Sequence, residues 1–219
     1  MIDHELYTHQ LTQMLKKAFQ NRLRYVGLQG SYMRGEAKEN SDIDIMVVIQ
    51  DLNVADLKLY RNMIESLGDF DKSCGFICST TDLEKWNPLE ICSLLHGTKD
   101  YYGKLETLVP SFTKKDVSDF AKVSLNNLYH EICHRYIHGS AESNCAGLPF
   151  CYKSTFFILQ TLQYLRTGEF IGTKQDLLEK LTGTDREVLR ISMDYPENDS
   201  FAELFELLFT WCQNSLKTL

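Results

Sequence analysis

The sequence predicts an α/β (α+β) fold in which a small mixed β-sheet in the first half precedes an all-helical second half. Two apolar, β-branched runs over residues 23–28 and 42–49 predict strands in the first fifty residues. Beyond Pro88 the apolar residues instead recur every three or four positions, which is typical of helices. We therefore expect two domains, 1–108 and 109–219.

The first half alternates helices and strands in a regular order. Leucine and phenylalanine at near-helical spacing predict a helix over residues 3–21. The run over residues 23–28 predicts a buried strand that ends at Gly30, and the run over 42–49 gives the strongest strand signal of the chain. After these come a helix over 54–67, a weaker strand over 73–79 and a capped helix that starts near Thr80.

In the second half every periodic segment predicts a helix and no strand is expected beyond Pro88. The aromatic-rich stretch over 150–164 is expected to belong to the core, and three glycines stand where helices would end, at 139, 168 and 183. The predicted helices cover residues 89–95, 116–138, 152–166, 174–181, 185–193 and 201–216.

Composition excludes several classes of protein. The chain of 219 residues is 43% hydrophobic and 24% charged, as globular proteins are, and its formal net charge of −7 argues against general nucleic-acid binding. A basic, apolar leader is not evident, and no apolar run reaches the roughly 20 residues that span a bilayer. The seven cysteines are scattered without a C-x-x-C pair. We expect a cytoplasmic protein with reduced thiols and no membrane association.

The candidate metal-binding and phosphate-binding residues of the first half lie between Gly30 and Asp44. Because side chains alternate along a strand, Asp42 and Asp44 are expected on one face, where their repulsion favours a bound cation. Carboxylates of this kind, together with substrate phosphates, suit Mg²⁺. Gly30-Ser31 follows a strand, so its backbone can approach a phosphate, with Arg34 adding positive charge nearby. This pattern predicts a nucleoside triphosphate held between backbone amides and a metal.

The stretch Gly30-Ser-Tyr-Met-Arg-Gly-Glu-Ala…Ser41-Asp-Ile-Asp44 resembles the DNA-polymerase-β-like nucleotidyltransferase superfamily, in the form of its small bacterial members. Those include the aminoglycoside and the minimal nucleotidyltransferases. The resemblance implies that Asp42 and Asp44 bind magnesium, that Gly30 and Ser31 bind the phosphates, and that a nucleoside monophosphate passes to an acceptor hydroxyl as pyrophosphate leaves. It also implies a third carboxylate on the next strand, yet residues 72–79 contain no acid. Nearby acids stand at 69, 71 and 90.

A competing motif, His-Glu-x-x-His, occupies residues 130–134 of a predicted helix. Histidines four residues apart share a helical face, which is the geometry of a zinc peptidase with Glu131 as its base, and His138 extends the row. The alternative interpretation is a polar face beside a domain boundary. By resemblance to the resistance enzymes, Glu131 is instead a candidate acid toward the acceptor. Lys153 is either a phosphate ligand or a lysine that reaches solvent.

Three hypotheses follow from these residues. The first is a Mg²⁺-dependent enzyme that transfers AMP from ATP to a small-molecule acceptor such as an aminoglycoside, with a protein acceptor as an alternative. The second is a non-catalytic relative that binds nucleotide or a protein, because the third strand lacks an acid. The third is a zinc hydrolase built on His130, Glu131 and His134.

Overall fold

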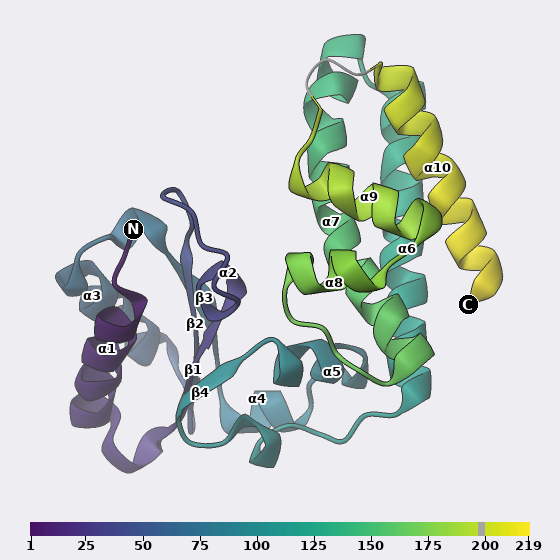
Figure 1. Ribbon diagram of the computed structural model, residues 1–219. Helices are drawn as coiled ribbons and strands as arrows, with labels where there is room; N and C mark the ends of the chain where they lie inside the picture. The colour runs from purple at the N-terminus through teal and green to yellow at the C-terminus, as the bar shows by residue number, and fades with distance from the viewer. Residues whose placement is uncertain (197–199) are drawn as a thin grey trace. The chain divides into compact units, whose positions relative to one another are not determined.

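The computed structural model describes residues 1–196 and 200–219, which fold as two compact units, Met1–Phe112 and Thr113–Leu219 (Figure 1). The first unit carries a mixed sheet and the second is helical, which confirms the predicted fold class. The first unit contains α1 His4–Phe19, β1 Leu23–Gln29, α2 Gly30–Met33, β2 Ile43–Ile49, α3 Val54–Leu67, β3 Ser73–Cys78, α4 Thr80–Glu84, α5 Pro88–His96 and β4 Lys99–Tyr102. The second contains α6 Lys114–His138, α7 Ala141–Thr167, α8 Lys174–Lys180, α9 Gly183–Met193 and α10 Phe201–Thr218.

The sheet has the order β3-β2-β1-β4. Strand β1 pairs antiparallel with both β2 and β4, whereas β2 and β3 run parallel. Strand β4 contradicts the expectation that no strand follows Pro88. Its four residues, Lys-Asp-Tyr-Tyr, show no apolar alternation, and they are a strand because their backbone pairs with β1, where Gly27 lies opposite Asp100.

The two faces of the sheet pack into separate cores. Alternate residues of β2, which include Ile43, Ile45 and Val47, are buried with side chains of α1 and α3, and Figure 1 shows these two helices beside the sheet. The intervening residues Met46 and Val48 pack on the opposite face in a second cluster with α4. Since side chains alternate along a strand, Asp44 belongs to this second face, at the end where β2 begins.

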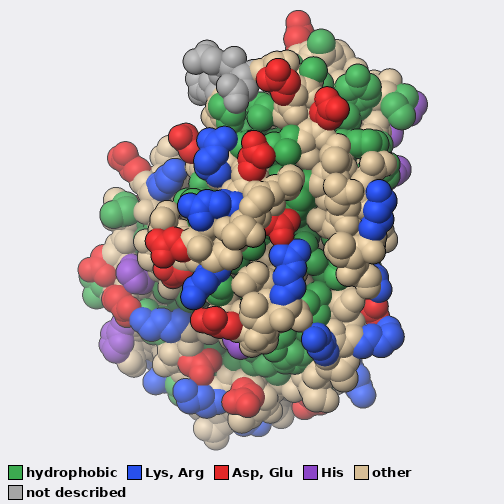
Figure 2. Space-filling model, turned by 45° about the vertical axis from the view of Figure 1, so that its right-hand side comes forward, with side chains coloured by type: hydrophobic (Ala, Val, Ile, Leu, Met, Phe, Trp, Pro, Cys, Tyr) green, Lys and Arg blue, Asp and Glu red, His purple; other side chains and the backbone are tan. Residues whose placement is uncertain are grey.

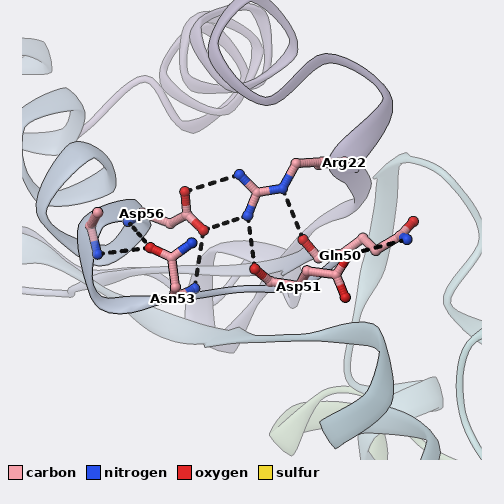
Figure 3. Close-up of polar contacts among 6 residues, drawn as sticks. Arg22, Gln50, Asp51, Asn53 and Asp56 are labelled. Atoms are coloured by element: carbon pink, nitrogen blue, oxygen red, sulfur yellow. Dashed lines mark hydrogen bonds and ion pairs between the residues drawn. The ribbon is translucent and has the colours of Figure 1, made fainter.

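A polar network fixes the start of α3 to the start of β1 (Figure 3). Arg22 donates through both of its terminal nitrogens to the carboxylate of Asp56, and also donates to the backbone carbonyls of Gln50 and Asp51. Asp56 in turn accepts from the backbone N–H of Asn53, whose side chain caps the helix. This reciprocal capping explains why α3 begins where its sequence pattern predicts.

In the second unit, α7 is longer than its pattern predicts, because it begins at Ala141 rather than at residue 152. Pro149 lies inside the helix, where a proline removes one backbone hydrogen bond. The added turns bury Asn144, Leu148 and Cys151, and the last two join α6 in the core of the second unit. Packing against α6 therefore offsets the proline, and a periodicity argument alone could not include that contribution.

One face of the molecule shows charged side chains of both signs among hydrophobic ones (Figure 2). Acidic and basic side chains are interspersed on the face shown in Figure 2, without a broad basic area there. None of the helices described is both long enough and apolar enough to cross a membrane. The seven cysteines are free thiols.

Candidate functional site

Gly30 and Asp44 meet where β1 passes into α2. The antiparallel register pairs Gln29 with Asp44, so the next residue, Gly30, starts α2 against the Asp44 side chain. Gly30 has a φ of +68°, and a Cβ built on it would lie 1.9 Å from Oδ2 of Asp44. Only glycine is compatible with both the left-handed backbone and this contact. The contact brings the first backbone groups of α2 onto a carboxylate that could bind a metal.

Asp42 and Asp44 are the two carboxylates that the sequence proposes as oxygen ligands for a metal. Asp42 is exposed just before β2, whereas Asp44 is half-buried. Burial raises the pKa of Asp44 most, a hydrogen bond from Cys74 opposes that rise, the charge of Asp42 adds to it, and the charge of Arg34 opposes it. A divalent cation beside the two carboxylates would relieve both the burial and the repulsion. The residues present therefore fit Mg²⁺, which prefers oxygen ligands.

Ser31 and Arg34 lie at the two ends of α2. Ser31 follows Gly30 in the first turn and is half-buried, and Arg34 is the residue that ends the helix. Nε of Arg34 donates to Oε2 of Glu36 over 2.8 Å, and the arginine side chain is 14% exposed. The charge of Arg34 is thus partly balanced by Glu36, although it still acts on Asp44. A phosphate contact by Ser31 or Arg34 stays a prediction.

The position beside Asp44 on the next strand is occupied by Cys74. The parallel register sets Ile43 opposite Ser73 and Asp44 opposite Cys74, and the Cys74 thiol donates to the Asp44 carboxylate. Sequence reasoning did not identify Cys74 as a site residue. Only the register of the parallel pair sets Cys74 beside Asp44, and the sequence alone does not give that register.

The three acids considered as replacements lie off this strand. Asp69 precedes a short 3₁₀ turn over Phe70–Lys72 with a left-handed backbone, and Asp71 lies exposed within that turn. The carboxylate of Glu90 accepts a 2.7 Å hydrogen bond from the indole of Trp86. Strand β3 therefore contributes a thiol and no carboxylate next to Asp44.

In the second unit, Glu131 lies on α6 and forms an ion pair with Nε of Arg135 one turn later. His130 and His134 are exposed on the same helix. Within residues 1–196 and 200–219, no three histidine, cysteine or acidic side chains are arranged to hold a metal ion. A catalytic zinc takes three protein ligands as a rule, and the glutamate of this motif is engaged by an arginine, so the structure does not support the zinc-hydrolase hypothesis.

A groove of about 540 Å³ runs between α6 and α7. Its walls combine the Glu131–Arg135 pair with aromatic side chains, of which Phe150 is 72% and Phe157 is 51% exposed. The expectation that residues 150–164 are core was therefore wrong for Phe157 and for Phe150, although Phe156 and Leu159 are buried. Lys153 is exposed on α7, and its role toward phosphate stays a prediction.

Comparisons with known proteins agree with this geometry. Residues 10–92 match the family described as "Polymerase beta, Nucleotidyltransferase". A search of curated protein sequences finds no match. A crystal structure described as spectinomycin adenyltransferase AAD(9) from Enterococcus faecialis with ATP and spectinomycin has the same fold, with a TM-score of 0.61 and 18% identity over 97% of this chain and 99% of that one. The family match spans β1, β2 and β3, and with them Gly30, Asp42 and Asp44, so this part of the chain is similar to the nucleotidyltransferase domains of the polymerase β family.

Proposed function

We propose that this protein transfers a nucleoside monophosphate, AMP from ATP, to a hydroxyl group of a small molecule. The contact between Gly30 and Asp44 carries the proposal, because it places the backbone at the start of α2 next to a carboxylate that needs a cation. The family matched by residues 10–92 and the fold shared with a structure described as an adenyltransferase support it.

Each candidate site residue of the first unit has a separate role in the proposed reaction. Asp42 and Asp44 hold Mg²⁺, which when bound would neutralise the triphosphate and help the α-phosphate accept the incoming oxygen. The backbone N–H groups at the start of α2 and the hydroxyl of Ser31 position the phosphates, because first-turn N–H groups have no partner within their own helix. Arg34 adds a positive charge close to Asp44.

We assign the acceptor to the groove between α6 and α7. Exposed phenylalanine side chains supply apolar surface for a ring system, and the carboxylate of Glu131 can bind an acceptor hydroxyl or amine. The related structure was described with ATP and spectinomycin, a small molecule, which favours a small-molecule acceptor for this chain as well. Glu131, held by Arg135, is our candidate to take the proton of the acceptor hydroxyl.

The test is calorimetric titration of ATP, GTP, CTP and UTP into the protein with and without Mg²⁺. We expect Mg²⁺-dependent binding with a preference for ATP, lost in Asp42→Asn and kept in Asp71→Asn, a matched change of a nearby exposed acid. Pyrophosphate release is then measured with spectinomycin and with aminoglycosides. If no nucleotide binds with any metal, the proposed function is wrong.

A second candidate function rests on Cys74. With a thiol beside Asp44 and no acid on β3, the domain could bind nucleotide without transferring it. This alternative predicts Mg²⁺-dependent ATP binding together with no pyrophosphate release for any small-molecule or protein acceptor. The same two measurements therefore separate the two candidates.

A further inference from the structure

Three histidines form a row along the exposed side of α6. His130, His134 and His138 follow one another at intervals of four residues, and all three side chains are exposed. Four residues correspond to about one helical turn, so neighbouring members of the row lie one above the other. The proposed transferase reaction gives this row no task.

One of the two ring separations in the row matches that of two imidazoles bound to one metal ion. With a Zn–N bond of about 2.1 Å and about 1.1 Å from nitrogen to ring centre, tetrahedral geometry sets two centroids roughly 5 Å apart. The centroids of His134 and His138 are 4.9 Å apart, whereas those of His130 and His134 are 5.9 Å apart. The pair at the end of the helix therefore has the better separation.

The surroundings of this pair also favour a cation. His138 is the last residue of α6, and the carbonyl groups in the last turn of a helix carry partial negative charge. The positive charge that lies nearest in the sequence, on Arg135, is engaged by Glu131. Imidazole suits Zn²⁺, Ni²⁺ and Cu²⁺, whereas Mg²⁺ prefers oxygen ligands.

We propose that His134 and His138 chelate a transition-metal dication such as Zn²⁺ or Ni²⁺ at the end of α6. The ion takes two ligands from the protein and completes its shell with water, so the site is a surface chelate and not a catalytic zinc centre. It is separate in residues and in metal preference from the Asp42–Asp44 pair, and it does not depend on the proposed transferase activity. Its consequence is a native state that zinc or nickel stabilises.

The experiment is calorimetric titration of Zn²⁺ and of Ni²⁺ into the whole protein in excess Mg²⁺, with thermal unfolding at each metal concentration. We expect one ion per chain and an unfolding temperature that rises with metal. His134→Gln leaves His130 and His138 two turns apart, and His138→Gln leaves only the wider His130–His134 pair. Both variants should therefore bind the metal about a hundredfold more weakly, because the second contact is no longer made within the same site. Glutamine is chosen because it favours helix about as well as the residues around it.

Two matched changes complete the test. His130→Gln removes a histidine from the same row, and His9→Gln removes an exposed histidine of α1, so both should keep the wild-type affinity. The proposal is wrong if wild-type protein binds neither ion, or if His134→Gln binds as tightly as wild type, which would assign the ion to thiols or carboxylates. Loss of binding in His130→Gln with retention in His138→Gln would also overturn the assignment of the pair.

Discussion

Substitution of Gly30 by alanine tests whether the start of α2 and the Asp44 carboxylate form one site. The new methyl group would lie 1.9 Å from Oδ2 of Asp44, against about 3.4 Å for an ordinary contact, so the carboxylate has to withdraw by about 1.5 Å. In addition, a side chain in the left-handed region costs about 1–2 kcal/mol. A displacement of about 1 Å at a reacting centre lowers rates by as much as a hundredfold.

Gly35 provides a matched control for this substitution. Its φ is +70°, nearly the same as that of Gly30, but a Cβ at Gly35 would meet no atom within 4 Å. Gly35→Ala should therefore show the backbone cost alone, with Mg²⁺-dependent ATP binding unchanged. Gly30→Ala should show the same cost or more and a loss of ATP affinity of at least about tenfold, which corresponds to about 1.4 kcal/mol.

The assay combines thermal or urea unfolding with calorimetric ATP titration on both variants. The double variant Gly30→Ala/Asp44→Ala removes the carboxylate that the methyl group would meet, so Asp44→Ala should raise the unfolding temperature more in the Gly30→Ala background than in wild type. The reasoning fails if Gly30→Ala binds ATP as wild type does, or if Gly35→Ala loses the same affinity. An equal effect of Asp44→Ala in the two backgrounds would show that no clash with Asp44 exists.

Three further predictions concern the same unit. Cys74→Asp adds a carboxylate opposite Asp44 and should tighten Mg²⁺ binding roughly tenfold, as measured by calorimetry, whereas Cys74→Ser should not. Burial, together with the charge of Asp42, raises the pKa of Asp44, so the native state loses stability as this carboxyl group ionises. Asp44→Asn should therefore unfold at a higher temperature than wild type. The difference in unfolding temperature should widen from acid to neutral pH. Asp56→Ala removes the carboxylate that accepts from the backbone N–H of Asn53 in the capping box of α3 and that pairs with Arg22, and it should cost about 1–2 kcal/mol in urea unfolding at neutral pH. Because Arg22 lowers the pKa of Asp56, this difference should shrink as the pH falls through that lowered pKa.

Local signals in the sequence were enough to predict most of the fold. The strand over 42–49 and the helix over 54–67 rest on side-chain alternation and on capping residues, which act within a few positions of the chain. These elements lie where the pattern places them, to within one residue. Short-range physical chemistry decides such elements, and a single sequence contains all of it.

The errors concern elements that long-range contacts create. Strand β4 is four residues long and exists because it pairs with β1, more than seventy positions earlier. The first turns of α7 contain Pro149 and persist because Leu148 and Cys151 pack in the core of the second unit. The spacing of apolar residues along the sequence does not include either contribution, because it depends only on neighbouring positions.

In the candidate site, too, local sequence suggests some features, whereas others depend on strand pairing. The sequence alone was enough to propose Gly30, Asp42 and Asp44, because the two aspartates stand two residues apart at the start of one strand and Gly30 follows the strand before it; their roles stay predictions. The close approach of Gly30 to Asp44 depends on the register between β1 and β2, which the sequence does not state. Cys74 was missed for the same reason, since only the pairing of β2 with β3 sets it beside Asp44.

The properties of the Cys74 thiol limit which group could accept the proton of the acceptor hydroxyl in the proposed transfer. Burial and the neighbouring Asp44 raise the pKa of Cys74, so the thiol stays neutral and cannot accept the proton of an acceptor hydroxyl. Another group must do so, and Glu131 is our candidate.

Glu131→Gln keeps the size of the side chain and removes its basicity. If Glu131 is that group, kcat should fall by about 10²–10⁴ with ATP binding unchanged, as measured by pyrophosphate release and calorimetry. Arg135→Gln removes only the partner of Glu131 and should change kcat far less. Full activity in Glu131→Gln would instead assign the proton to substrate phosphate or solvent, and would leave the groove with a role in binding alone.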